Sequence, residues 1–233
     1  MYRVIAVVGA ALCLSACASA YVGKPYERSD AGIHNIALAA GAVPDKASAF
    51  QVASVGSNFG LVGALVDAGI QKSREDAVNS SLTQAGFDAK AKLQERIAAD
   101  LATNGYAVKP LSETPRAKRE FLATYPKADD ADAYLDVVVL DYGYLSAGYG
   151  KPFRPTVKAE VRLVSARDPA KTLMENQIDY NAMSPRDGVV TISPNPEYEF
   201  ANRTDMLADP KRLAGGIEDA LDQVADTAAK LLK

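Results

Sequence analysis

The chain has 233 residues, of which 48% are hydrophobic and 24% are charged, and its formal net charge is −3. The negative charge argues against a nucleic-acid-binding protein, because phosphate backbones select basic surfaces. One histidine and two cysteines leave few residues for a catalytic triad or a zinc site, and the length suits one domain with a well-filled core.

The first residues have the pattern of an export signal. Arg3 precedes an apolar run from Val4 to Leu14, which fits the core of a signal peptide and is too short to span a bilayer. The run ends in Leu14, Ser15, Ala16 and Cys17. This ending resembles the lipobox of bacterial lipoproteins, and the resemblance implies a signal peptide over residues 1–16 and acyl chains such as palmitate on Cys17. The alternative is an ordinary signal peptide cut nearby, which leaves Cys17 without a role.

The same resemblance implies a location. Lipoproteins that stay in the inner membrane carry an aspartate after the lipidated cysteine, whereas this chain has Ala18 and Ser19, so we expect a periplasm-facing anchor in the outer membrane. Residues 17–32 contain Gly, Pro, Ser and mixed charges without a hydrophobic period, which predicts a lipidated tether. A single periplasmic domain is then expected over residues 33–233.

The stretch from Ala47 to Val66 contains no charged residue, but its polar residues and glycines make a membrane span a poor interpretation. Apolar residues between Phe59 and Ile70 recur at helical spacing, beside a row of small residues that includes Gly56 and Gly60. We therefore expect a helix that packs closely on the domain's own sheet. Contact with a second copy or with a membrane surface is the alternative.

Hydrophobic periodicity predicts the remaining elements. Strands are predicted at Ile33–Ala40, Tyr106–Val108, Tyr134–Tyr144, Thr156–Leu163 and Thr172–Tyr180, and helices at Ala85–Asn104 and after Asp209. Tyr134–Tyr144 is apolar enough for the centre of a sheet, and the polar stretches Leu111–Lys127 and Met183–Asn202 are predicted loops. The fold class is therefore α+β: a mixed sheet of about five strands with a C-terminal hairpin, packed by two to three helices including a C-terminal one.

The order of these elements resembles the α/β domain of envelope-transport lipoproteins related to the Tol-system amino-terminal domain and the curli-export lipoprotein. Two passages carry the resemblance. The first is the helix, stop and strand from Leu93 to Tyr106, and the second runs from Ala131-Asp132-Ala133 through an apolar strand to Tyr142-Gly143. Both passages are structural rather than catalytic, so the resemblance implies a fold and a cellular setting.

The residues that could do chemistry are sparse. His34 opens a predicted strand and is best interpreted as structural, because no second histidine or Gly-x-Ser-x-Gly elbow accompanies it. Four aspartates form an acidic cluster before the central strand, at positions Asp129, Asp130, Asp132 and Asp136. Their spacing matches no EF-hand loop, so a solvated acidic turn is favoured over a calcium site. We expect no enzyme activity, no cofactor and no metal.

Aromatic and cationic residues gather after the predicted central strand. They are Tyr142, Tyr144, Tyr149, Phe153 and Arg154. Sheet packing with an exposed hairpin loop is the preferred interpretation, and contact with a partner protein or glycan is the alternative.

The sequence as a whole therefore predicts a lipid-anchored accessory or scaffold protein of envelope assembly or transport, which binds other envelope proteins through a sheet edge or the glycine-rich helix. The alternatives are a ligand-binding or weakly enzymatic lipoprotein that uses the tyrosine-rich loop, and a homo-oligomeric ring component.

Overall fold

The structure is a computed structural model that describes residues 21–27, 32–52, 60–111 and 114–233. The lipobox residues, Cys17 and Gly56 lie outside the described residues, as do the side chains of residues 60–67. The strands are β1 (Asn35–Leu38), β2 (Ser48–Gln51), β3 (Ala107–Pro110), β4 (Ala133–Ser146), β5 (Phe153–Ser165), β6 (Thr172–Tyr180) and β7 (Val190–Ile192). The helices are α2 (Gly60–Gln84), α3 (Ala89–Thr103), α4 (Arg203–Ala208), α5 (Pro210–Lys230) and the 3-10 turn η2 (Pro196–Tyr198).

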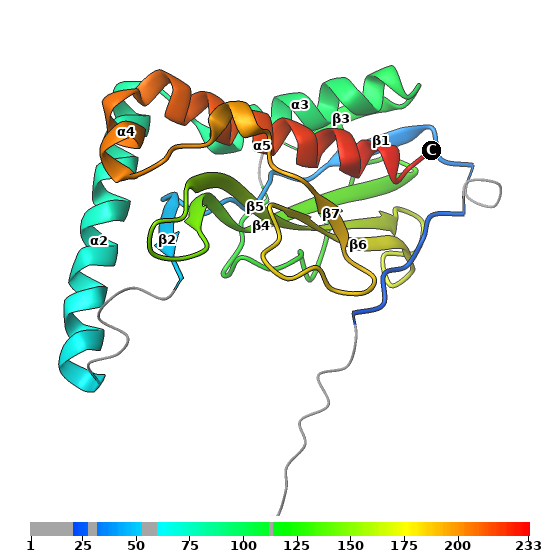
Figure 1. Ribbon diagram of the computed structural model, residues 1–233. Coiled ribbons are helices and arrows are strands. Elements are labelled where there is room, and N and C mark those ends of the chain that lie inside the picture. Colours follow the sequence, from blue (N-terminus) through cyan, green and yellow to red (C-terminus); the bar gives the residue numbers. More distant parts are fainter. Residues whose placement is uncertain (1–20, 28–31, 53–59, 112–113) are drawn as a thin grey trace, which may run out of the picture.

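The described strands form one mixed sheet in the order β3-β1-β4-β5-β6-β7, with β2 also paired to β4 (Figure 1). The α+β class, the central place of β4 and the antiparallel β5–β6 hairpin are confirmed. The expected count of about five strands is wrong, since the sheet has seven. β2 lies in the uncharged stretch before the predicted glycine-rich helix, to which no element was assigned, and β7 lies in a predicted loop. Because β7 follows β6, the hairpin does not end the sheet.

The central strand β4 supports both halves of the sheet. It pairs with β5 along one edge, while β1 and β2 run parallel to its other edge at Ala133–Leu135 and Gly143–Ser146. Between these two contacts the register of β4 shifts from Val139 to Asp141, so Leu140 sits in a β-bulge. β4 therefore keeps a stretch of edge that neither β1 nor β2 covers as a regular strand.

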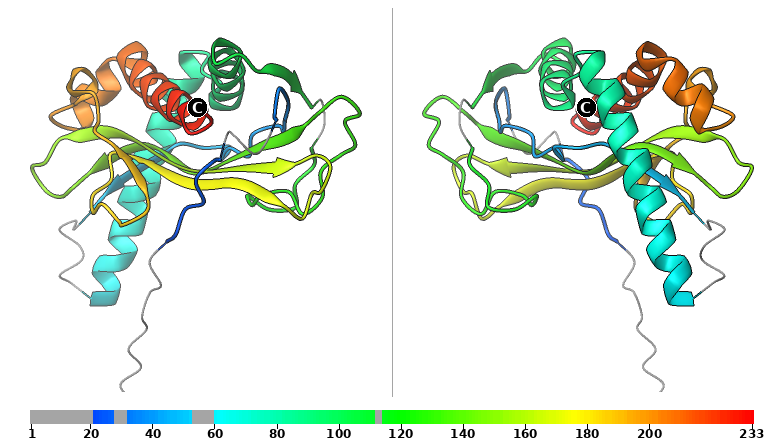
Figure 2. Two further views of the ribbon diagram at one scale, coloured as in Figure 1. Left: turned by 90° about the vertical axis from the view of Figure 1, so that its right-hand side faces the viewer. Right: turned by 90° about the vertical axis from the view of Figure 1, so that its left-hand side faces the viewer.

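Helices α3 and α5 cover one face of the sheet (Figure 2). In α5, Asp209 caps the N-terminus by accepting a hydrogen bond from the Arg212 N–H at 3.0 Å, and Pro210 occupies the first turn. Its apolar face is buried from Leu213 to Ala229. The described residues form four helices, whereas the sequence predicted two to three. The additional helix α4 has six residues, which are too few to show a helical hydrophobic period.

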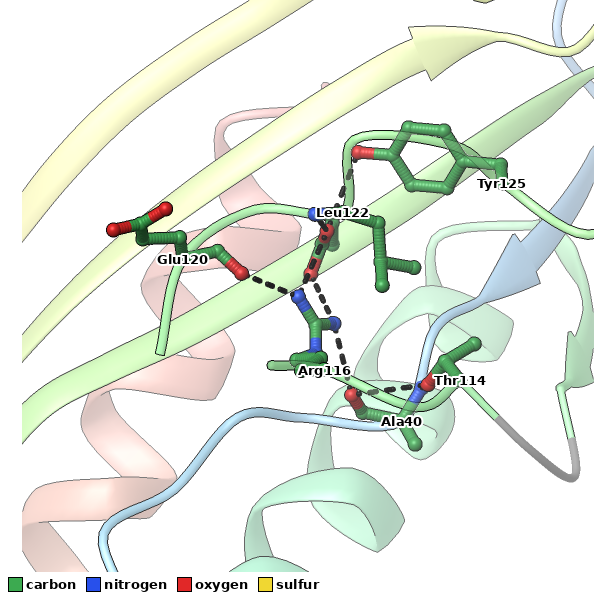
Figure 3. Close-up of polar contacts among 7 residues, drawn as sticks. Ala40, Thr114, Arg116, Glu120, Leu122 and Tyr125 are labelled. Atoms are coloured by element: carbon green, nitrogen blue, oxygen red, sulfur yellow. Dashed lines mark hydrogen bonds and ion pairs between the residues drawn. The ribbon is translucent and has the colours of Figure 1, made fainter. Parts of the chain in front are cut away.

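The loop of residues 114–125 partly covers the opposite face of the sheet. Asp136 of β4 is fully buried there, and Arg116 of the loop binds it at 2.6 Å (Figure 3). Arg116 also donates to the carbonyls of Ala40 and Glu120, at 2.9 and 2.8 Å. The ion pair thus fastens the predicted loop to both β4 and the end of β1.

Among the side chains of α2 that the structure describes, from Ala68 onward, those in the C-terminal part of the helix pack on the domain. The buried side chains are Val78, Ser81 and Leu82. Ser73 marks the beginning of the contact, because Arg203 of α4 donates to its carbonyl at 3.0 Å. The residues before it, Ala68–Ile70, are exposed, and the N-terminal part of α2 runs past the sheet (Figure 1). The expectation that this helix packs along the domain's own sheet therefore does not hold for Ala68–Ile70.

Candidate functional site

The tyrosine-rich passage does not form one surface. Tyr142 and Tyr144 are buried under the helices, and the Tyr144 hydroxyl donates to the Leu213 carbonyl of α5 at 3.1 Å. Phe153 is also buried, whereas Tyr149 is 80% exposed in the β4–β5 turn. Arg154 forms an exposed ion pair with Glu199 at 2.6 Å. These side chains therefore point into different environments and do not converge in one pocket.

The four aspartates of the acidic cluster also separate. Asp129 and Asp130 are exposed, which fits a solvated turn. Asp132 accepts hydrogen bonds from the backbone N–H groups of Asn35 and His34, at 2.8 and 2.9 Å, and these bonds lower the pKa of its carboxyl group. Asp136 is no part of a solvated turn, because it is buried against Arg116.

No group of three or more histidine, cysteine, aspartate or glutamate residues is arranged to hold a metal ion in the described part of the chain. His34 is exposed beside the start of β1, and its backbone rather than its ring makes the contact to Asp132. The described residues therefore bring no catalytic histidine or metal ligand set together.

A groove beside Leu140 and Asp141 of β4 is the strongest candidate that the sequence did not reveal. Two adjoining cavities of about 590 and 550 Å³ share Val43, Asp45 and Arg119 among their lining residues. The walls are the β1–β2 connection, the loop of residues 114–119 and the bulge of β4. We call this feature the β4 groove and define it by Asp45, Lys46, Arg119, Leu140 and Asp141.

The β4 groove depends on local backbone geometry. The positive φ of Gly143, 145°, and its contact with β2 require glycine, since a Cβ atom there would lie 2.0 Å from the Ser48 carbonyl oxygen. This close approach holds β2 against the end of β4, while β1 holds the beginning. A glycine between two strand tyrosines was the one sequence signal of this arrangement, because strand glycines mark bulges and close backbone contacts.

Charges of both signs line the β4 groove. The Ser48 hydroxyl donates to Asp141 Oδ2 at 3.1 Å, and burial raises the pKa of Asp141 despite this bond and the nearby Lys158 and Arg119. Arg119 donates to the Leu140 carbonyl at 3.2 Å. Leu140 is 40% exposed, so an apolar side chain stands within a charged rim.

This arrangement is suited to binding rather than to covalent chemistry. Within the described residues, the Ser48 hydroxyl has the Asp141 carboxylate as its hydrogen-bond partner, and no histidine lies among the lining residues. Asp45, Lys46 and Arg119 are exposed, so the β4 groove is open to large partners. Opposite charges around an apolar centre resemble the composition of protein-binding surfaces.

Comparisons with known proteins assign no family. No family model matches the chain, and no curated protein matches it. Among solved structures, protein XCC0632 of Xanthomonas campestris, described with the family model DUF330, is similar with a TM-score of 0.45 and 10% identity over 90% of each chain. Lipoprotein GNA1162 of Neisseria meningitidis is similar with a TM-score of 0.30 and 18% identity, over 63% of this chain and 81% of its own. Similarities this distant assign neither a function nor a partner to the chain.

Proposed function

We propose that the chain is a lipid-anchored accessory or scaffold protein of the cell envelope, and that it binds another envelope protein at the β4 groove. The observation that carries this proposal is the composition of the groove: exposed charges of both signs surround a partly exposed leucine, and no histidine or cysteine lies among the lining residues.

Charge and exposure favour a protein over a small ligand as the occupant. Small-molecule sites are mostly apolar and enclose their ligand, whereas Asp45, Lys46 and Arg119 of the β4 groove are exposed. Arginine is enriched among the residues that contribute most to protein binding, and the charged neighbours would orient a partner of complementary charge. The half-buried Asp141 gives the groove a negative charge at pH values above the raised pKa of its carboxyl group.

The anchor is the second part of the proposal. The lipobox resemblance supports acylation of Cys17, and the absence of aspartate at Ala18 and Ser19 supports an outer-membrane location. The resemblance to Tol-system and curli-export lipoproteins supports a role in envelope assembly or transport. In this setting the lipid holds the domain at the membrane, and the β4 groove remains available to a periplasmic partner.

Affinity capture after crosslinking in intact cells tests the partner site. Arg119→Glu reverses an exposed charge of the β4 groove, and Lys211→Glu makes the same reversal at an exposed position on α5 as the matched control. We expect Arg119→Glu to lose the crosslinked partner and Lys211→Glu to retain it. Retention of the same partner by both variants would overturn the proposed site.

The ligand-binding alternative is tested in the same preparation. A ligand-binding protein that uses the tyrosine-rich loop requires accessible rings, but Tyr142 and Tyr144 are buried. Tyr149→Ala removes the exposed ring of that loop. We expect it to leave capture unchanged, and loss of the partner in this variant alone would favour the loop over the β4 groove.

A further inference from the structure

Helix α2 is longer than the surface that its own domain offers. Its 25 residues give a length of about 38 Å. Among the described side chains, from Ala68 onward, the first hydrogen bond to another element is at Ser73 and the first buried side chain is Val78. Ala68, Gly69 and Ile70 are exposed, with Ile70 at 41%. Packing on the domain therefore does not explain the amino-acid composition of the N-terminal part of the helix, which is described next.

That part of α2 does not have the composition of a helix in water. Between Gly60 and Ile70 the only charged residue is Asp67, and the others are aliphatic residues, alanine or glycine. A surface helix that stands free in solvent normally carries polar residues on its exposed sides. This apolar segment, residues 60–70, is called the α2 arm below.

The position of the α2 arm relative to the chain's beginning indicates what covers it. Figures 1 and 2 show the N-terminal end of α2 and the start of the described N-terminal segment, residues 21–27, on the same side of the sheet. Lys24 of that segment pairs with Glu175 of β6, which fixes where the chain leaves the domain. The α2 arm and the chain exit thus face in the same direction.

Exposed apolar side chains also occur around the chain exit. Val22 is 85% exposed in the N-terminal segment, and Met183 is 50% exposed in the β6–β7 connection. The two segments are neighbours, because a Cβ atom on Gly188 would lie 2.2 Å from the Tyr21 carbonyl oxygen. Exposed apolar side chains therefore occur in the two segments that meet at the chain exit.

The length of chain before Tyr21 limits how far this side stands from the lipid. Three residues lie between Cys17 and Tyr21, so the four steps of a fully extended chain would span at most about 14 Å. With Cys17 acylated in the membrane, the exit side of the domain is held beside the lipid headgroups. A tether this short keeps the local concentration of lipid surface high, which favours even a weak second contact.

We propose that the α2 arm is a second membrane contact, which lies in the interface of the phospholipid leaflet that holds the Cys17 anchor. This inference rests on the proposed acylation of Cys17. Eleven helical residues span about 16 Å, roughly half of a hydrocarbon core. Among the described residues no helix has both the length and the apolar composition to cross a bilayer. The N-terminal end of the α2 arm therefore enters the interface on the side of the chain exit and fixes the orientation of the domain.

The cysteine content of the protein allows a direct test on the full lipidated chain. Acylation consumes the thiol of Cys17, and Cys13 leaves with the signal peptide, so an introduced cysteine is the only free thiol. Leu65→Cys places a dye on the α2 arm, and Lys211→Cys places it on α5 as the matched control. Both proteins are reconstituted in vesicles of phosphatidylethanolamine and phosphatidylglycerol with lipids brominated on the acyl chains.

We expect bromolipid to quench most of the Leu65→Cys emission, from a depth of about 5–10 Å below the headgroups, and to leave the Lys211→Cys emission unchanged. Equal emission of both dyes with and without bromolipid would overturn the membrane contact while leaving the anchor intact. Energy transfer between dyes on two α2 arms without bromolipid quenching would overturn it in favour of a second copy. Mass spectrometry that shows a free Cys17 thiol would overturn both the anchor and this inference.

Discussion

Removal of the Asp136 carboxylate should destabilise the fold strongly. Asp136 is fully buried and accepts two hydrogen bonds from Arg116, at 2.6 and 3.2 Å. It also accepts one from the Leu122 N–H at 2.9 Å and one from the Tyr125 hydroxyl at 3.2 Å. Asp136→Ala therefore leaves a guanidinium group, itself 9% exposed, and two further donors without their acceptor. Breaking one partner of a buried ion pair costs about 3–5 kcal/mol.

We expect the lower end of this range, about 3 kcal/mol, because the loop of residues 114–125 lies near the surface and can admit water around Arg116. The measurement is urea unfolding followed by circular dichroism, on mature protein with Cys17→Ser. Glu199→Ala serves as the control, since it breaks the exposed Arg154–Glu199 pair and should cost less than about 1 kcal/mol.

A double variant separates the charge from the packing. Arg116→Met with Asp136→Leu removes both charges and fills the space with apolar groups, so it should be more stable than Asp136→Ala alone. A loss of less than about 1 kcal/mol for Asp136→Ala would show that the pair behaves as a solvated surface pair. That result would refute the reasoning that this ion pair fastens the loop to β4.

Two further predictions concern α5 and the β4 groove. Gly216→Ala should lower the free energy of unfolding by about 3 kcal/mol, because the added Cβ atom would lie 2.2 Å from the Tyr144 hydroxyl oxygen. Adding Tyr144→Phe should restore part of this loss. An unchanged urea midpoint for Gly216→Ala would contradict this packing. Asp141→Asn should stabilise the protein at pH 7. Burial raises the pKa of Asp141 above its value in the unfolded chain, which is about 4. The folded state of the wild type therefore loses stability as the pH rises from about 4 through the raised pKa, and the amide of the variant avoids this loss. Thermal melts between pH 4 and 7 measure this, and identical pH slopes for the wild type and Asp141→Asn would contradict it.

Local sequence signals were sufficient for the long elements. The cap at Asp209, Pro210 and an apolar face at helical spacing define α5 before any tertiary contact is known. The β-branched run of β4 predicted the central strand. Gly105, with a φ of 88°, follows the end of helix α3, as the sequence predicted. These signals act over a few residues and so survive in the sequence alone.

Local sequence signals did not predict the short strands β2 and β7. β2 has four residues and β7 has three, too few to show a period of two. Their strand conformation comes from pairing with β4 and β6, across about 95 and 12 residues of sequence respectively. Pairing partners at such distances are a property of the whole sheet, so the sequence analysis predicted no strand at β2 and a loop at β7.

Some features of the candidate sites could be predicted from the sequence, whereas others required the tertiary structure. The sequence by itself determined the resemblance of residues 14–17 to a lipobox, the number of residues between Cys17 and Tyr21 and the apolar composition of the α2 arm, since each is a contiguous stretch. Only the tertiary structure decided that Asp136 is buried against Arg116, that the β4 groove joins the β1–β2 connection to the loop of residues 114–119, and that the α2 arm faces the same way as the chain exit. The physical reason is that burial and direction depend on which distant segments pack together, whereas anchoring and helix formation depend on neighbours in the chain.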